Sequence, residues 1–221
     1  EGNTFNGSNA IAFNLGTGTA LEEKDNVDNT QMIVAKIGET YITSLAEAFD
    51  AVETEATIKV LHNTDMSAVT VENGKTITLD LNGKNVTAPT SSAFEVKGGK
   101  LTIKNGNVTA YEAVVRAIGG EVVIESGNYV QTGTAVDTPS TYRYCVDVRE
   151  GGKATINGGE FTSGNGMLNV NPNSELIVNG GKFTNKVEKS MTRHFAYVSG
   201  KLTINDGEFY GKANSSAGGC F

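Results

Sequence analysis

A short sequence pattern returns six times and constrains the fold of this chain more than any other feature. In its clearest copies, residues 98–103 (GGKLTI) lead to 105–109 (NGNVT), and residues 151–156 (GGKATI) lead to 158–162 (GGEFT). The copies recur at intervals of roughly 20 to 30 residues. Such self-similarity predicts a repeat architecture in which each unit packs mainly against its neighbours. The charged residues that open the copies are Lys75, Lys100, Glu121, Lys153, Glu175 and Lys201.

Each copy has the pattern of short β-strands joined by tight corners. Apolar residues alternate with polar ones after the opening residue, as Leu101 and Ile103 do, which is the period of a strand with one buried face. A glycine six positions after the opening residue predicts a corner with positive φ or close backbone approach. These glycines are Gly106, Gly127, Gly159, Gly181 and Gly207. Two positions further on stands an apolar column: Val108, Tyr129, Phe161, Phe183 and Phe209.

These units predict an all-β chain that forms a single-stranded, right-handed parallel β-helix of about six to seven coils. Stacking places each strand beside its copy on the next coil, in parallel, so that like residues form columns. Asn157, Asn179 and Asn205 are then expected to form an asparagine ladder at one corner. The right hand follows from the general preference of parallel crossovers, and not from these residues.

The open hydrophobic end of a stacked solenoid needs a cap, and residues 43–52 supply a candidate. Ser44 with Glu47 matches a capping box. We therefore expect a capping helix near residues 44–53, followed by a strand over 57–61. The apolar face of this helix is formed by Leu45, Ala48, Phe49 and Val52.

The sequence divides into an N-terminal arm or linker, residues 1–34, and the β-helix, residues 35–221. The arm is rich in Gly, Asn and Thr and does not fit the repeat. It is either an extended linker or a strand donated to the sheet edge of a neighbouring molecule. The last copy, over 201–210, is complete and no recognisable cap follows it. Homo-assembly through residues 1–34 and through the open C-terminal end is therefore one expectation.

Composition excludes several classes of function. The net charge of −7 and the pI near 4.9 argue against nucleic-acid binding, which needs clustered Lys and Arg. No apolar run reaches the length of a membrane span. The two cysteines, Cys145 and Cys220, fall about three coils apart, or roughly 14 Å, which is too far for a disulfide. We expect both thiols to stay unbonded.

The sequence offers few candidates for catalysis, and we expect no catalytic residue, metal or cofactor. His62 and His194 are isolated, without partners at metal-ligand or triad spacing. On stacked coils, Glu95 and Asp147 would lie roughly 10 Å apart, near the upper limit for an inverting glycosidase. Arg116 stands between them, however, and favours a surface charge ladder of low energy. Two outward rows are involved. The first consists of Glu95, Arg116, Asp147 and Asn169, and the second of Lys97, Ile118, Arg149 and Asn171.

Two insertions, over residues 131–144 and 185–195, are expected to overhang this same face and to line a binding surface. Tyrosines there could stack on sugar rings while the charged residues bond to hydroxyl or carboxylate groups. The alternative is that the tyrosines only pack the insertion onto the rod. The candidate ligand-binding residues are Arg116, Tyr142, Arg143, Tyr144, Asp147 and Arg149.

Residues 35–48, 57–61 and 75–84, together with the GGKLTI and NGGKFT repeats, resemble bacterial surface proteins described as pectate-lyase-like adhesins. The resemblance spans roughly residues 35–210. It implies a secreted or surface-exposed protein, often a module of something larger, and it implies no activity. Enzymes of this fold carry an acidic calcium cluster with a catalytic arginine, or clustered aspartates, and neither pattern is present in the sequence.

The sequence thus predicts a non-enzymatic structural or adhesive protein, located outside the cell or on its surface. Its expected partners are glycan, other surface proteins or a copy of itself. The alternatives are a polysaccharide lyase or glycoside hydrolase acting on acidic polysaccharide, and a filament or phage virion subunit.

Overall fold

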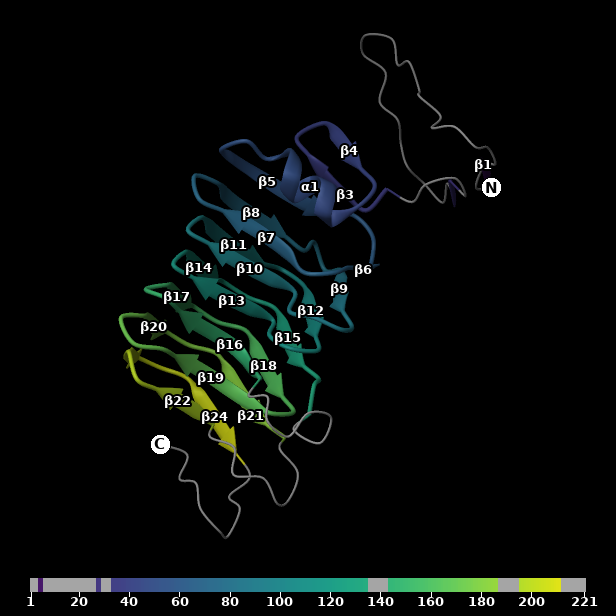
Figure 1. The fold of residues 1–221 in the computed structure, drawn as a ribbon. Helices are drawn as coiled ribbons and strands as arrows, with labels where there is room; N and C mark the ends of the chain where they lie inside the picture. The colour runs from purple at the N-terminus through teal and green to yellow at the C-terminus, as the bar shows by residue number, and fades with distance from the viewer. Residues whose placement is uncertain (1–3, 6–26, 29–32, 135–142, 187–194, 212–221) are drawn as a thin grey trace.

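The chain folds into a parallel β-solenoid of about six turns, with one short helix near the N-terminal end of the described residues (Figure 1). A computed structural model describes residues 4–5, 27–28, 33–134, 143–186 and 195–211. The predicted parallel β-helix is confirmed. The described part of the arm contains β1 (Thr4–Phe5) and β2 (Val27–Asp28), which pair in parallel.

Three sheets run along the rod, and each coil contributes one strand to each of them in turn. The first sheet contains β5 (Glu55–Val60), β8 (Thr76–Asp80), β11 (Lys100–Lys104), β14 (Glu121–Ile124), β17 (Lys153–Ile156), β20 (Glu175–Val178) and β23 (Lys201–Ile204). The second contains β6 (Thr64–Asp65), β9 (Asn85–Ala88), β12 (Asn107–Ala110), β15 (Asn128–Gln131), β18 (Glu160–Ser163), β21 (Lys182–Asn185) and β24 (Glu208–Gly211). The third contains β7 (Val69–Glu72), β10 (Phe94–Lys97), β13 (Val115–Ile118), β16 (Tyr144–Arg149), β19 (Gly166–Val170) and β22 (Ala196–Val198).

The core consists of columns of identical or similar side chains, as the repeat predicts. In the second sheet, Tyr129, Phe161, Phe183 and Phe209 occupy one register position on successive coils. Their rings stack with centroids 4.9, 4.7 and 4.9 Å apart. This spacing matches the distance between neighbouring strands, so each ring contacts the next over its face. The predicted aromatic column is confirmed.

Asparagine ladders join successive coils at two places. In the predicted ladder, the Asn179 side-chain amide donates to Asn157 at 2.8 Å, and that of Asn205 donates to Asn179 at 2.7 Å. A second ladder runs along the second sheet and was not predicted: Asn107 donates to Asn85 at 2.7 Å, and Asn128 donates to Asn107 at 2.8 Å. In each ladder, the side-chain amides hydrogen-bond to one another because they occupy equivalent positions on consecutive coils.

The repeated glycines form corners by the two mechanisms that the sequence suggests. Gly127, Gly159, Gly181 and Gly207 have φ of 127°, 110°, 115° and 144°, values that residues with a side chain rarely adopt. Gly106 is required for space instead, because a Cβ there would lie 2.3 Å from the Cβ of Leu81.

The helix α1 (Leu45–Ala51) and the antiparallel β3–β4 hairpin cover the N-terminal end of the rod (Figure 1). Strands β3 (Ala35–Ile37) and β4 (Thr40–Ile42) extend the first sheet beyond β5. The predicted apolar face of the helix is buried, and Phe49 stacks on Phe94 with ring centroids 5.9 Å apart. Lys75 donates to the carbonyls of Phe49 and Asp50 at 3.1 and 3.2 Å, so its charge lies at the C-terminal end of the helix.

The capping box is only half formed. The Ser44 hydroxyl accepts from the Glu47 backbone N–H at 3.1 Å, as predicted. The Glu47 carboxylate accepts from the Thr43 hydroxyl at 2.7 Å. At the arm boundary, Val34 is already buried, and its backbone pairs with Ile42 and Leu61.

The described helix is too short to cross a membrane.

Candidate functional site

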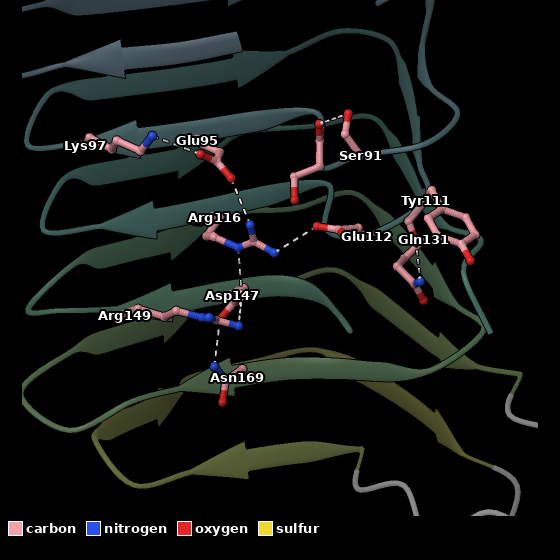
Figure 2. Close-up of polar contacts among 11 residues, drawn as sticks. Ser91, Glu95, Lys97, Tyr111, Glu112, Arg116, Gln131, Asp147, Arg149 and Asn169 are labelled. Carbon is pink, nitrogen blue, oxygen red and sulfur yellow. Dashed lines mark hydrogen bonds and ion pairs between the residues drawn. The ribbon is translucent and has the colours of Figure 1, made fainter. Parts of the chain in front are cut away.

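The outward face of the third sheet contains a row of polar side chains that come from successive coils. Glu95 lies beside Arg116, Arg116 beside Asp147, and Asp147 beside Asn169, in the predicted register. Figure 2 shows Arg116 between Glu95 and Asp147, with Glu112 to one side. The expected row is therefore confirmed in its order.

Arg116 is the centre of this cluster and contacts three carboxylates. Its guanidinium lies 2.8 Å from Glu95, 3.1 Å from Asp147 and 3.4 Å from Glu112. Partial burial alone would lower the pKa of Arg116. The charge and hydrogen bond of Asp147, followed by the charges of Glu95 and Glu112, outweigh this effect and raise the pKa. Arg116 thus stays cationic and holds three coils together.

Asp147 is buried, which corrects the prediction of a surface charge ladder at this position. Its side chain is only 1% exposed. One carboxylate oxygen accepts from Arg149 Nε and from Asn169 Nδ2, both at 2.7 Å. The other lies 3.1 Å from Arg116 Nε and 2.6 Å from Arg149 Nη2. The physical reason for the difference is that two arginines from neighbouring positions lie over the same carboxylate.

This bonding leaves Asp147 poorly suited to catalysis. Four donor contacts occupy its two oxygens, so no lone pair is directed at a substrate or at an attacking water. The cluster is also balanced in charge, because Lys97, Arg116 and Arg149 face three carboxylates within it. The geometry therefore favours a structural role for this row.

The candidate residues of the first insertion make contacts within the protein. Tyr144 is 6% exposed and packs over Gly166, the residue beside it on the next coil. Arg143 is also buried, with its guanidinium carbon 4.6 Å from the ring centroid of Tyr111. Both side chains are therefore largely covered by the protein, and for Tyr144 this is the contact that the alternative interpretation describes. Residues 135–142 and 187–194 of the two insertions lie outside the described residues, and Tyr142 is among them.

Both insertions leave the rod at the corner between the second and third sheets, since they connect β15 to β16 and β21 to β22. A buried polar column supports this corner. The Gln131 side chain donates to the carbonyls of Tyr111 and Gly133 at 2.8 and 2.6 Å, and it accepts from the Ser163 hydroxyl at 2.8 Å. This column was not predicted from the sequence. The sequence does contain a sign of it: the inward position that Ala88 and Ala110 occupy is taken by the polar residues Gln131 and Ser163 on the next two coils.

A groove of about 450 Å³ runs across four coils at the corner between the third and first sheets. Glycines that precede the repeat motif form part of its floor, and Gly74 and Gly98 have φ of 84° and 81°. Lys100 and Glu121 on its rim are paired at 2.7 Å. The other charged lining residues are Lys75 and Lys153. The groove is polar, and its lining contains no aromatic side chain among the residues that the structure describes.

No group of three His, Cys, Asp or Glu side chains close enough to hold a metal ion occurs among the described residues. Cys145 is a buried free thiol whose pKa is raised by desolvation. Cys220 lies outside the described residues.

Comparisons of this chain with protein-family models, with curated proteins and with solved structures find no match in any of the three. The fold and the site geometry therefore define the class of protein: a parallel β-solenoid built from sequence repeats.

Proposed function

We propose that this chain is a non-enzymatic structural or adhesive rod that acts outside the cell. The observation that carries the proposal is the charge cluster on the third sheet. Asp147 accepts from Arg116, Arg149 and Asn169 and is 1% exposed, so the best catalytic candidate is used to join coils. A carboxylate in this state stabilises the rod and does not transfer protons to a ligand.

The proposed location of the protein rests on its sequence, and the proposed partner rests on the sequence together with the topology of the sheets. The repeats and the capping segment resemble those of bacterial pectate-lyase-like adhesins, which supports display at a cell surface. The stems of both insertions leave the rod at one corner, which supports a binding face on that side. We propose two residues for glycan contact: Tyr142 in the first insertion, and Arg149, whose side chain is 36% exposed. Arg149 ends β16 at the opposite edge of the third sheet, so the proposed face spans the width of that sheet.

The competing function is that of a lyase or hydrolase acting on acidic polysaccharide, and a release assay separates the two. The chain is incubated with polygalacturonate, with and without calcium, and released uronates are measured. We expect no turnover. Turnover that disappears in Asp147→Asn and persists in Glu112→Gln would overturn the non-enzymatic proposal.

Adhesion is tested on a glycan array with single variants. Arg149→Ala and Tyr142→Ala are expected to abolish the signal of the unmodified chain. Tyr41→Ala is the matched control, because Tyr41 is 49% exposed and lies in β4 at the far end of the rod. An array without signal, or equal loss in the Tyr41 control, would remove glycan binding from the proposal.

A further inference from the structure

Six Asn-Gly pairs occur in the described part of the chain, each with its asparagine outside the strands. Asparagine is a thermolabile residue, and a following glycine has no side chain to hinder attack of its nitrogen on the asparagine side chain. The sequence gives all six pairs the same reactive dipeptide, whereas the structure gives them different hydrogen bonds. The six asparagines are Asn73, Asn82, Asn105, Asn157, Asn165 and Asn179.

In two of the pairs the glycine nitrogen is already held by a backbone hydrogen bond. Gly83, which follows Asn82, donates to the carbonyl of Asn105 at 2.6 Å. Gly166, which follows the buried Asn165, donates to a backbone carbonyl of the preceding coil at 2.8 Å. Turning either nitrogen toward the asparagine side chain would break a bond between coils.

In two further pairs the asparagine side chain is held at both ends by the first of the two ladders. The Asn157 amide donates to Glu125 at 3.0 Å and accepts from Asn179 at 2.8 Å. Asn179 in turn accepts from Asn205 at 2.7 Å. These side chains cannot rotate toward the following glycine without opening the ladder.

The side chain of Asn105 is also held at both ends, although it belongs to no ladder. Its amide donates to Asp80 at 3.3 Å, and its oxygen accepts from the Ser126 hydroxyl at 3.3 Å. The Asn105 backbone N–H donates to the same hydroxyl at 3.1 Å. Ser126 therefore holds both the backbone and the side chain of this asparagine.

Asn73 has none of these restraints. It is exposed, and neither its side chain nor the Gly74 N–H makes a hydrogen bond among the described residues. Gly74 has φ of 84°, and a Cβ at this position would have no atom within 4 Å. The corner of residues 73–75 is also one residue longer than the corner of residues 98–99 on the next coil. Room and freedom to rotate thus coincide at this pair.

We propose that Asn73 is a site of spontaneous deamidation and that the fold protects the other five described Asn-Gly pairs. The Gly74 nitrogen forms a bond to the side-chain amide carbon of Asn73, which closes a succinimide ring. The bond from that carbon to the amide nitrogen breaks, and this nitrogen leaves as ammonia with the proton of the Gly74 N–H. Water then opens the ring at either carbonyl and leaves aspartate or isoaspartate. The steps consume only water.

The modification changes the charge of the groove between the third and first sheets. Asn73 lines this groove together with Lys75, Lys100, Lys153 and Glu121. Three lysines and one glutamate give the lining a net charge of +2, and one new carboxylate lowers it to +1. Because Asn73 lies between β7 and β8, the strand ladders keep their partners, and we expect the rod to stay folded. The inference does not depend on the adhesive function proposed above.

Peptide mapping by mass spectrometry tests the proposal, after the folded protein has been held at mildly alkaline pH. We expect Asn73 to be converted about tenfold faster than any of the other five, because each of those must first release one or more hydrogen bonds. In protein unfolded by urea, the six pairs should lose this difference. Ser126→Ala should speed the conversion of Asn105 and leave that of Asn73 unchanged.

Three results would overturn the proposal. The first is a folded protein in which another described pair reacts as fast as Asn73. The second is the same order and spread of rates in urea, which would assign the selectivity to the sequence and not to the fold. The third is a Ser126→Ala variant that folds, as its unfolding curve shows, and converts Asn105 no faster than the unmodified chain does.

Discussion

Replacing Asp147 with Asn tests whether the buried charge cluster holds the coils together. The substitution keeps the shape of the side chain and removes its charge. The new amide would direct N–H groups at the donors of Arg116, Arg149 or Asn169, which now bond to the carboxylate. The substitution therefore creates no cavity, and its effect reports the polar contacts.

The size of the effect follows from burial and from the partners that remain. Removing one partner of a buried ion pair costs about 3–5 kcal/mol. Arg116 retains Glu95 and Glu112, and the Arg149 side chain is 36% exposed, so we expect a loss at or below the lower limit of this range, about 2–3 kcal/mol. For a domain of this size, that loss lowers the melting temperature by about 4–12 °C.

Glu95→Gln is the matched control, because Glu95 binds the same arginine but is 19% exposed. We expect a loss of about 1 kcal/mol or less from this change. Both variants are melted at low ionic strength and in about 1 M salt, where screening acts over about 3 Å. High salt should reduce the loss of melting temperature in Glu95→Gln and leave most of the loss in Asp147→Asn. Equal shifts in the two variants at both salt concentrations would refute the assignment of a buried, coil-joining carboxylate.

Two further predictions concern the core. Phe183→Ala should lower the free energy of unfolding by about 4 kcal/mol, since the ring is fully buried and stacks on both Phe161 and Phe209. Phe209→Ala, on the last described coil, should cost less than half of that, because this ring is only partly buried. Equal losses of stability in urea would contradict the stacked column. Burial raises the pKa of Tyr129 and Cys145, so only their unfolded forms ionise near the ordinary values of 10.0 and 9.0. The free energy of unfolding should therefore fall above about pH 9, by about 1.4 kcal/mol per pH unit for each group. Tyr129→Phe should remove one of the two contributions, and an unchanged pH profile would contradict this.

The asparagine ladders are contacts that can be predicted from the sequence repeat. Asn157, Asn179 and Asn205 were predicted to form a ladder because they share one offset from the motif, and they do. Asn107 and Asn128 also share an offset, seven residues after Lys100 and Glu121, so the same reasoning could have found this part of the second ladder. Asn85, which extends that ladder, lies ten residues after Lys75 and departs from the offset. Both depend only on register, and register follows from the repeat.

The charge cluster has a property, the burial of Asp147, that the repeat does not predict. The order Glu95, Arg116, Asp147 was predicted, yet the burial of Asp147 was not. Burial depends on where the long side chains of Arg116 and Arg149 turn, and their rotamers are not set by sequence spacing. The packing of Tyr144 over Gly166 is similar, because it joins two coils that differ in sequence.

The amino-acid sequence alone determined the solenoid, the strands of its coils, the aromatic column and the helical cap, because each arises from a local pattern that recurs at a regular interval. The tertiary structure decided which charged groups are buried and where a groove opens between sheets. These features arise from contacts between coils whose side chains differ, and such contacts have no period for a sequence pattern to reveal.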